Sequence, residues 1–206
     1  MYLEWLTVAA AAGILYYVRK KDELASLAEV LPTVETERLR LRPWQLSDVE
    51  DMYEFAKDPL VGPDAGWLPH TSIEETRLQV EQYIESRHVF AIELKTEGKV
   101  IGNIGVYNRQ PDPSKDDLSQ RALGFVLNPD YWHQGYMTEA VKAVIQYCFN
   151  TLELELLWCG HFPGNMRSQK VIQRCGFDYK MTLPVILKEM NNREADLMYY
   201  SLRQIK

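Results

Sequence analysis

Cysteine is scarce in this chain of 206 residues, and the few cysteines form no metal-binding or disulfide pattern. Cys148, Cys159 and Cys175 make no CxxC pair, and no histidine follows them at zinc-finger spacing. An odd and sparse set is typical of reduced thiols in a cytosolic protein. We therefore expect a cytoplasmic protein with no disulfide framework, no structural zinc and no other metal site.

Positive charge is also in short supply, because 23 Lys and Arg face 29 Asp and Glu and leave a net charge of −6. Nucleic-acid binders normally carry a basic surface, so we expect no nucleic-acid partner. The 11 glycines and 10 prolines are too few for a disordered or collagen-like chain. The length fits one globular domain with an appendage.

The one long apolar run lies at the N-terminus. From Leu3 to Val18 the only charge is Glu4, and three basic residues follow at 19–21. The run is shorter than the ~20 residues of a membrane-spanning helix, and it lacks the positive start of a signal peptide. We expect residues 1–35 to form an apolar helix and a linker. This helix packs on the domain, forms a homodimer, or contacts a membrane through residues 1–18 with the domain in the cytoplasm.

Strand and helix patterns alternate from Thr36 onward and predict a second domain, 36–206. Ser47 with Glu50, and Ser72 with Glu75, have the spacing of capping boxes at helix starts. Strands are predicted at 38–44, 88–94, 99–108, 120–128, 154–161, 177–187 and 195–203, helices at 46–58, 72–87, 135–150 and 165–175, and a loop at 62–70. This order predicts an α/β fold of mixed α+β type, with a single central mixed sheet of about seven strands flanked by helices.

One strand–loop–helix segment has the composition of an anion-binding site. After the strand that ends near Leu127, a short loop enters a helix through His133, Gln134, Gly135, Tyr136, Met137 and Thr138. Gly135 lets the backbone approach a ligand, and the first turn of a helix offers unpaired N–H groups and a positive dipole end. The segment is neither a P-loop nor a dinucleotide fingerprint. It predicts a phosphate or pyrophosphate site, and a plain turn glycine is the alternative.

A second segment places Asn165 and Ser168 three residues apart at the start of a helix that ends at Gly176. Asn165 is a good N-cap, and Gly176 is a good residue to end the helix. With the first segment, this pattern resembles the GNAT superfamily of acyl-CoA-dependent N-acetyltransferases, in particular the branch that acetylates ribosomal-protein N-termini at alanine or serine. The resemblance covers residues 36–202 and rests on TERLRLRPWQLSDVEDMYEF, YWHQGYMTEAVKAVIQYCF and N-x-x-S-x-x-V-x-x-x-x-GF.

The resemblance implies a GNAT-like fold and a role for each matched residue. The strand residues Phe125, Val126 and Leu127 would expose backbone groups to the pantetheine arm of acetyl-CoA, which binds in the splay between two parallel strands. The loop 133–138 would hold the CoA pyrophosphate through its N–H groups. Asn165 would hydrogen-bond the pantetheine amides, and Ser168 would lie near the sulfur.

The sequence departs from the family pattern at three positions. In the family signature Q/R-x-x-G-x-G/A, Trp132 occupies the first slot and Met137 the last. Ile172 stands four residues before Gly176, where many members carry a tyrosine that reprotonates the leaving thiolate. Ser168 is therefore our candidate for this catalytic role.

The resemblance predicts an enzyme that transfers an acetyl group from acetyl-CoA to a primary amine. The acceptor is a protein N-terminus or a small-molecule amine, which attacks directly through a tetrahedral intermediate. The oxyanion needs donors, which the strand N–H near Val126 would supply. The base stays open among a water chain, Glu93, His88 and His161. The alternative function is a catalytically weak acyl-CoA-binding regulatory module, with which the missing tyrosine is compatible.

Overall fold

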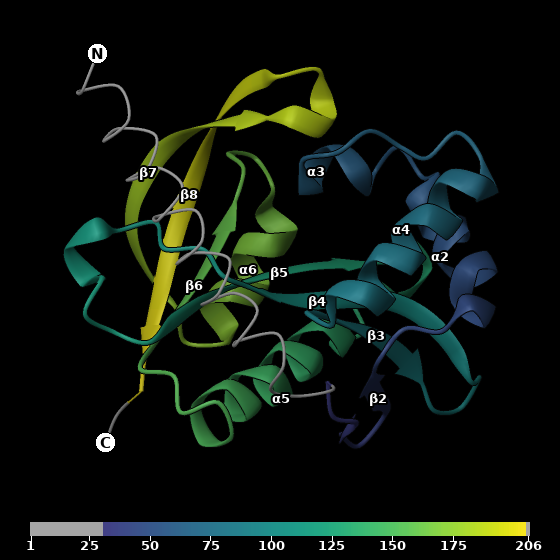
Figure 1. The fold of residues 1–206 in the computed structure, drawn as a ribbon, viewed down its shortest axis with the longest axis horizontal. Coiled ribbons are helices and arrows are strands. Elements are labelled where there is room, and N and C mark those ends of the chain that lie inside the picture. The colour runs from purple at the N-terminus through teal and green to yellow at the C-terminus, as the bar shows by residue number, and fades with distance from the viewer. Residues whose placement is uncertain (1–30, 205–206) are drawn as a thin grey trace, which may run out of the picture.

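The computed structural model describes residues 31–204, so the predicted N-terminal helix and most of its linker lie outside the described residues. The described chain forms one eight-stranded mixed sheet in the order β1-β2-β3-β4-β5-β6-β8-β7 (Figure 1). The strands are β1 (Val34–Glu35), β2 (Leu39–Arg42), β3 (Val89–Leu94), β4 (Lys99–Tyr107), β5 (Gln120–Leu127), β6 (Leu156–His161), β7 (Asp178–Leu187) and β8 (Arg193–Arg203). All predicted strands are confirmed. The additional strand β1 is two residues long, too short for a period-two pattern to reveal.

The helices are α2 (Val49–Ala56), α3 (Gly62–Ala65), α4 (Ile73–Ser86), α5 (Tyr136–Asn150) and α6 (Met166–Arg174). The predicted cap of α4 is confirmed, because the Ser72 side chain accepts a hydrogen bond from the Glu75 N–H at 3.2 Å. The predicted cap at Ser47 is wrong. A 3-10 turn starts one residue earlier, at Leu46, and the Asp48 carboxylate accepts from the Gln45 N–H at 2.8 Å. The segment predicted as a loop at 62–70 begins with the short helix α3.

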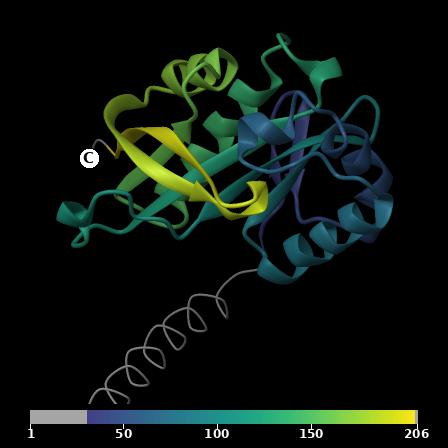
Figure 2. The same ribbon diagram turned by 90° about the horizontal axis from the view of Figure 1, so that it is seen from above.

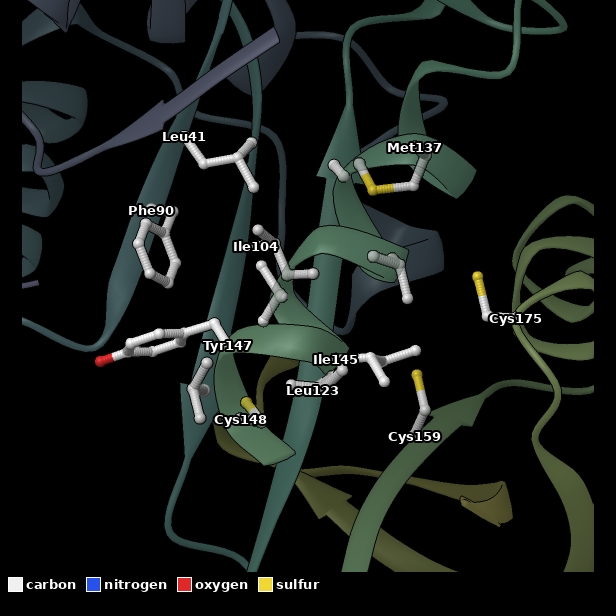
Figure 3. Packing of buried hydrophobic residues seen from close by; sticks show 14 of the residues in the cluster. Leu41, Phe90, Ile104, Leu123, Met137, Ile145, Tyr147, Cys148, Cys159 and Cys175 are labelled. Carbon is white, nitrogen blue, oxygen red and sulfur yellow. The ribbon is translucent and has the colours of Figure 1, made fainter. Parts of the chain in front are cut away.

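The two larger apolar cores lie on opposite faces of the sheet. Helices α5 and α6 cover one face, and α2 and α4 cover the other (Figures 1 and 2). In the larger core, Phe90 of β3 packs edge-on against Tyr147 of α5, with ring centroids 5.7 Å apart (Figure 3). The three cysteines are buried in this same core as free thiols. The sheet therefore has a helical layer on each side, as the alternating pattern predicts.

The strands β5 and β6 are parallel, and they separate toward their carboxyl ends. They pair over four residues, from Gln120 with Leu156 to Leu123 with Cys159. Beyond this point β5 continues to Leu127 and pairs with β4 but no longer with β6. Helix α5 follows β5 and helix α6 follows β6, so the N-termini of both helices lie at the opening. Ligands of α/β sheets bind at carboxyl ends of this kind.

Candidate active site

A cavity of about 310 Å³ lies at the opening between β5 and β6. Its walls come from the end of β5, the loop before α5, the first turns of α5 and α6, and the segment around α3. The structure brings all predicted site residues except Gln134 to this cavity: Phe125, Val126, Leu127, His133, Gly135, Tyr136, Met137, Thr138, Asn165 and Ser168. The two sequence segments therefore meet at one place, although 26 residues of helix, strand and loop lie between Thr138 and Asn165.

The backbone of β5 presents two N–H groups to the opening. The Asn128 N–H donates to a carbonyl of β4 at 2.8 Å. Because bonded and non-bonded positions alternate along an antiparallel ladder, the Val126 backbone also faces β4, while Phe125 and Leu127 face away from it. The Trp132 indole N–H donates to the Leu127 carbonyl at 2.8 Å, which agrees with this direction. The strand N–H groups that point into the opening are therefore those of Phe125 and Leu127, on either side of Val126.

The loop before α5 leaves the start of that helix open to an anion. Gly135 is the N-cap residue, has a φ of 83°, and carries no side chain that could cap the first turn. The N–H groups of this turn have no partner within the helix. His133 also has a positive φ, 64°. Gln134 lies outside the cavity lining, because its side chain donates to the Asp130 carbonyl at 3.3 Å and its own carbonyl accepts from Arg38 at 2.9 Å.

Asn165 has the predicted capping role at the start of α6. Its Oδ1 accepts from the Ser168 N–H at 3.0 Å, and its Nδ2 donates to the Asp64 carbonyl at 3.2 Å. An amide nitrogen carries two protons, so one remains for a ligand. Gly176, at the other end of the helix, has a φ of 87°, as the residue after a helix often does. Ile172 is 1% exposed and belongs to the apolar core rather than to the cavity.

Three cationic residues of α6, which we did not single out from the sequence, also line the cavity. Arg167, Lys170 and Arg174 lie three and four residues apart, so one face of the helix carries them all. This spacing was visible in the sequence. Arg167 also bonds Asp64 of α3 at 2.7 Å, and its guanidinium lies 4.1 Å from the centre of the Trp132 ring. The chain is acidic as a whole, so this cationic wall favours an anionic ligand locally.

The structure does not bring the candidate bases from the sequence to the cavity lining. Both oxygens of Glu93 bond arginines of β2, at 2.7 Å to Arg40 and 2.6 Å to Arg42. The ring of His161 is buried, and its Nδ1 lies 2.9 Å from the Phe162 carbonyl. His88 precedes β3 and is not part of the cavity wall.

Within residues 31–204, no helix has the length and apolar character needed to cross a membrane. In the same part of the chain, no group of three or more His, Cys, Asp or Glu side chains is arranged to hold a metal ion.

A mixed sheet whose parallel strands part beside two helix N-termini defines an α/β protein with a cavity at the carboxyl ends of those strands. Residues 38–178 match the family described as acetyltransferase (GNAT) domain, so the chain belongs to the GNAT family of acetyltransferases. The family match ends at the start of β7 and includes every residue that we predicted for the site.

The chain is similar to several individual acetyltransferases. An uncharacterized N-acetyltransferase, p20 of Bacillus licheniformis, is 25% identical over 177 residues, which cover 84% of this chain and 96% of p20. The ribosomal-protein-S5-alanine acetyltransferase from Vibrio fischeri has a TM-score of 0.65 and 22% identity, over 84% of this chain and 96% of that one. The microcin C7 self-immunity acetyltransferase MccE, solved with acetyl-CoA and AMP, has a TM-score of 0.66 and 19% identity, over 82% of this chain and 94% of that one. The two structures share the fold.

Proposed function

We propose that the protein transfers an acetyl group from acetyl-CoA to a primary amine. The observation that carries this proposal is the cavity at the opening of β5 and β6, which joins strand N–H groups to a helix N-terminus with a cationic wall. A phosphorylated thioester with an extended amide arm needs these features together. Membership of the GNAT family supports acetyl transfer, and the MccE structure supports acetyl-CoA as the donor.

The residues of the cavity fit the two halves of CoA. The Phe125 and Leu127 backbone would pair with the pantetheine amides as an added strand would, and Asn165 has one amide proton left for the same arm. The loop 133–138 and the cationic face of α6 would take the phosphates. When bound, acetyl-CoA supplies the activated carbonyl carbon.

The chain would assist the transfer by holding protons and negative charge. Of the two β5 N–H groups, the one nearer the thioester would stabilise the oxyanion of the tetrahedral intermediate. Water in the cavity would carry the proton away from the attacking amine. Ser168 lines the cavity one helical turn after Asn165, so its hydroxyl would donate a proton to the leaving thiolate.

The acceptor is a protein N-terminus or a small-molecule amine. The similarity to an S5-alanine acetyltransferase supports a peptide whose first residue is alanine. A catalytically weak acyl-CoA-binding module is the second candidate. The buried position of Ile172 favours it, because this side chain lies in the core and offers no proton donor to the cavity.

Thiol release separates the two candidates. Purified protein and acetyl-CoA are mixed with a panel of N-terminal Ala and Ser peptides, polyamines and aminoglycosides, and free CoA is measured. An enzyme releases CoA with at least one acceptor, in step with acetylated product. Binding of CoA by calorimetry with no release above the uncatalysed rate for any acceptor would support the binding module instead. No binding of CoA at all would overturn both.

A further inference from the structure

We propose that Arg38 is a positioning residue that holds the cofactor loop 133–138 in the shape that receives the CoA phosphates. This inference rests on the proposed function, because it concerns the same cofactor. Arg38 lies between β1 and β2, and it does not line the cavity. It would therefore act through the loop and the first turn of α5.

The Arg38 side chain makes three separate contacts with this region. Its Nη1 donates to the Gln134 carbonyl at 2.9 Å, within the loop. Its Nε and Nη2 each lie 2.7 Å from Oε2 of Glu139 in the first turn of α5. Its guanidinium carbon lies 4.3 Å from the centre of the Tyr136 ring. A planar guanidinium can make such a set of contacts at once, and a lysine cannot.

The contact with Glu139 keeps a competing carboxylate away from the phosphate site. A carboxylate in the first turn is attracted to the same N–H groups that an anionic ligand needs. Here the second oxygen of Glu139 accepts from the Thr36 hydroxyl at 2.6 Å and from the Arg38 N–H at 2.9 Å. Both oxygens are therefore engaged by the β1–β2 turn, which leaves the first turn of α5 available.

The same side chain lies against the turn glycine of the loop. Gly135 has a φ of 83°, a backbone conformation that residues other than glycine rarely adopt. A Cβ built at this position would lie 3.5 Å from Nη2 of Arg38. The guanidinium therefore supports the left-handed turn from the side away from the cavity. Without it, we expect the loop to sample other conformations and its N–H groups to lose their common direction.

The proposal predicts a loss that is confined to the phosphate half of the cofactor. The loop 133–138 serves the phosphates, whereas β5 and Asn165 would serve the pantetheine arm. S-acetylpantetheine carries the thioester and both amides but no phosphate and no adenosine. A positioning role for Arg38 should therefore appear with CoA and acetyl-CoA and vanish with S-acetylpantetheine.

Arg40 provides a matched control two residues along the chain. It is also an arginine in two ion pairs, 2.8 Å to Glu35 and 2.7 Å to Glu93. The exposed fraction of its side chain is 44%, against 39% for Arg38. None of its hydrogen bonds within the described chain reaches the cofactor loop.

The experiment measures CoA binding by calorimetry, and kcat/KM for acetyl-CoA and S-acetylpantetheine, for Arg38→Gln, Arg40→Gln and the wild type. We expect Arg38→Gln to weaken CoA binding by about ten- to a hundredfold, because a misplacement of about 1 Å in a binding group can cause a loss of up to about a hundredfold. Its kcat/KM for S-acetylpantetheine should stay within about twofold of the wild type, since only the phosphate half is affected. Arg40→Gln should leave both ligands unchanged.

The other outcomes distinguish a failure of the positioning role from a failure of the proposed function. Wild-type affinity of Arg38→Gln for CoA, or an equal loss for S-acetylpantetheine, overturns the positioning role and leaves the proposed function standing. If the wild type binds CoA but acetylates nothing, the proposed function fails while the calorimetric comparison still tests Arg38.

Two further variants cover the case in which Arg38→Gln does not fold. Arg38→Lys keeps the charge but loses the forked contacts, so it should also weaken CoA binding. Glu139→Gln should weaken CoA binding less than Arg38→Lys, because Arg38 and its contact to the Gln134 carbonyl remain. Wild-type affinity in Arg38→Lys would show that charge alone matters, and would overturn the positioning role.

Discussion

At the scale of single residues, Ser168 carries the sharpest prediction about chemistry. Ile172 is buried where many family members have a tyrosine, so the departing thiolate needs another proton donor. A donor used only in the transition state affects kcat more than binding. Ser168→Ala should lower kcat by roughly ten- to a thousandfold, because water would replace part of the roughly hundred- to ten-thousandfold contribution of a general acid. Calorimetry should find CoA affinity nearly intact, and turnover at the wild-type rate would assign the proton to water.

Glu139 predicts a dependence of stability on pH. Burial raises the pKa of its carboxyl, but the hydrogen bonds from Thr36 and Arg38 and the charge of Arg38 outweigh this and leave the pKa below its ordinary value of 4.5. A lowered pKa in the folded state adds stability that is complete above the ordinary pKa and is lost as pH falls through the folded value. Urea unfolding of wild type and Glu139→Gln should therefore differ at neutral pH and converge in acid. A difference that is equal at both pH values would contradict this.

The buried cysteines should not react in the native protein. Burial raises the pKa of Cys148 and Cys159 to about 12 and that of Cys175 to about 11. Because the thiolate is the reactive form, a chromogenic disulfide reagent should detect no protein thiol until the chain is unfolded, when three appear. The same reagent can then measure released CoA without a protein background. Fast labelling of the native protein would show that this core opens readily.

Residues that act through local geometry were predictable, and residues that act across the fold were not. The cap at Asn165 and the turn at Gly135 follow from the preferences of those residues at helix starts and positive φ. Arg38 meets Glu139 across 101 residues of sequence. Only the packing of β2 beside α5 brings them together, and no local pattern records it. Asp64 reaches α6 in the same way, through a contact between distant segments.

At the scale of elements, the strand and helix pattern predicted the sheet because the apolar residues of each long element recur with one consistent period. The errors arose in short pieces, where a hydrophobic period has no room to appear: the two-residue strand β1, the four-residue helix α3 and the cap of the 3-10 turn that begins at Leu46. The separation of β5 from β6 was implied by the resemblance alone. It depends on the number of residues over which the two strands pair, and this number cannot be predicted from the sequences of the two strands.

Gly135 gives the element-scale prediction, since it joins the loop to α5. Gly135→Val should abolish the rise in melting temperature that CoA produces, because a β-branched residue strains a φ of 83° and its Cβ would lie 3.5 Å from Nη2 of Arg38, which supports the loop. Gly98→Val is the control. Gly98 also has a positive φ, 64°, and a Cβ there meets nothing within 4 Å. Both variants should lose stability, but only Gly98→Val should keep the CoA shift. A full shift in Gly135→Val would remove the phosphate assignment from this loop.

At the scale of the whole molecule, one wall of the cavity is positively charged although the net charge of the chain is negative. The chain carries −6, yet the cavity wall includes Arg167, Lys170 and Arg174. An acidic surface with one cationic wall directs an anionic cofactor to that wall and repels it elsewhere. Composition alone therefore gave no sign of the local cluster of positive charge. The helical spacing of the three cations on α6 is the signal that composition hides.

The boundary of the folded domain gives the last prediction, because the described core begins before the first long strand. Leu31 is 7% exposed and belongs to the larger core, and β1 follows at Val34. Deleting residues 1–30 should leave a folded protein with wild-type CoA affinity, since the sheet and cavity keep every described contact. Deleting residues 1–35 removes Leu31 and β1, and the lost leucine burial alone should cost about 1.5–3 kcal/mol of unfolding free energy.

Thermal unfolding and CoA calorimetry on the two truncations test this boundary. The longer deletion should melt at a lower temperature than the shorter one, and it should also bind CoA less tightly, because β1 leads into Thr36 and Arg38, which hold Glu139. Loss of folding in the shorter deletion would mean that residues 1–30 contribute to the core. Equal behaviour of both deletions would mean instead that Leu31 and β1 add nothing measurable, and that the domain begins at Thr36 as the sequence predicts.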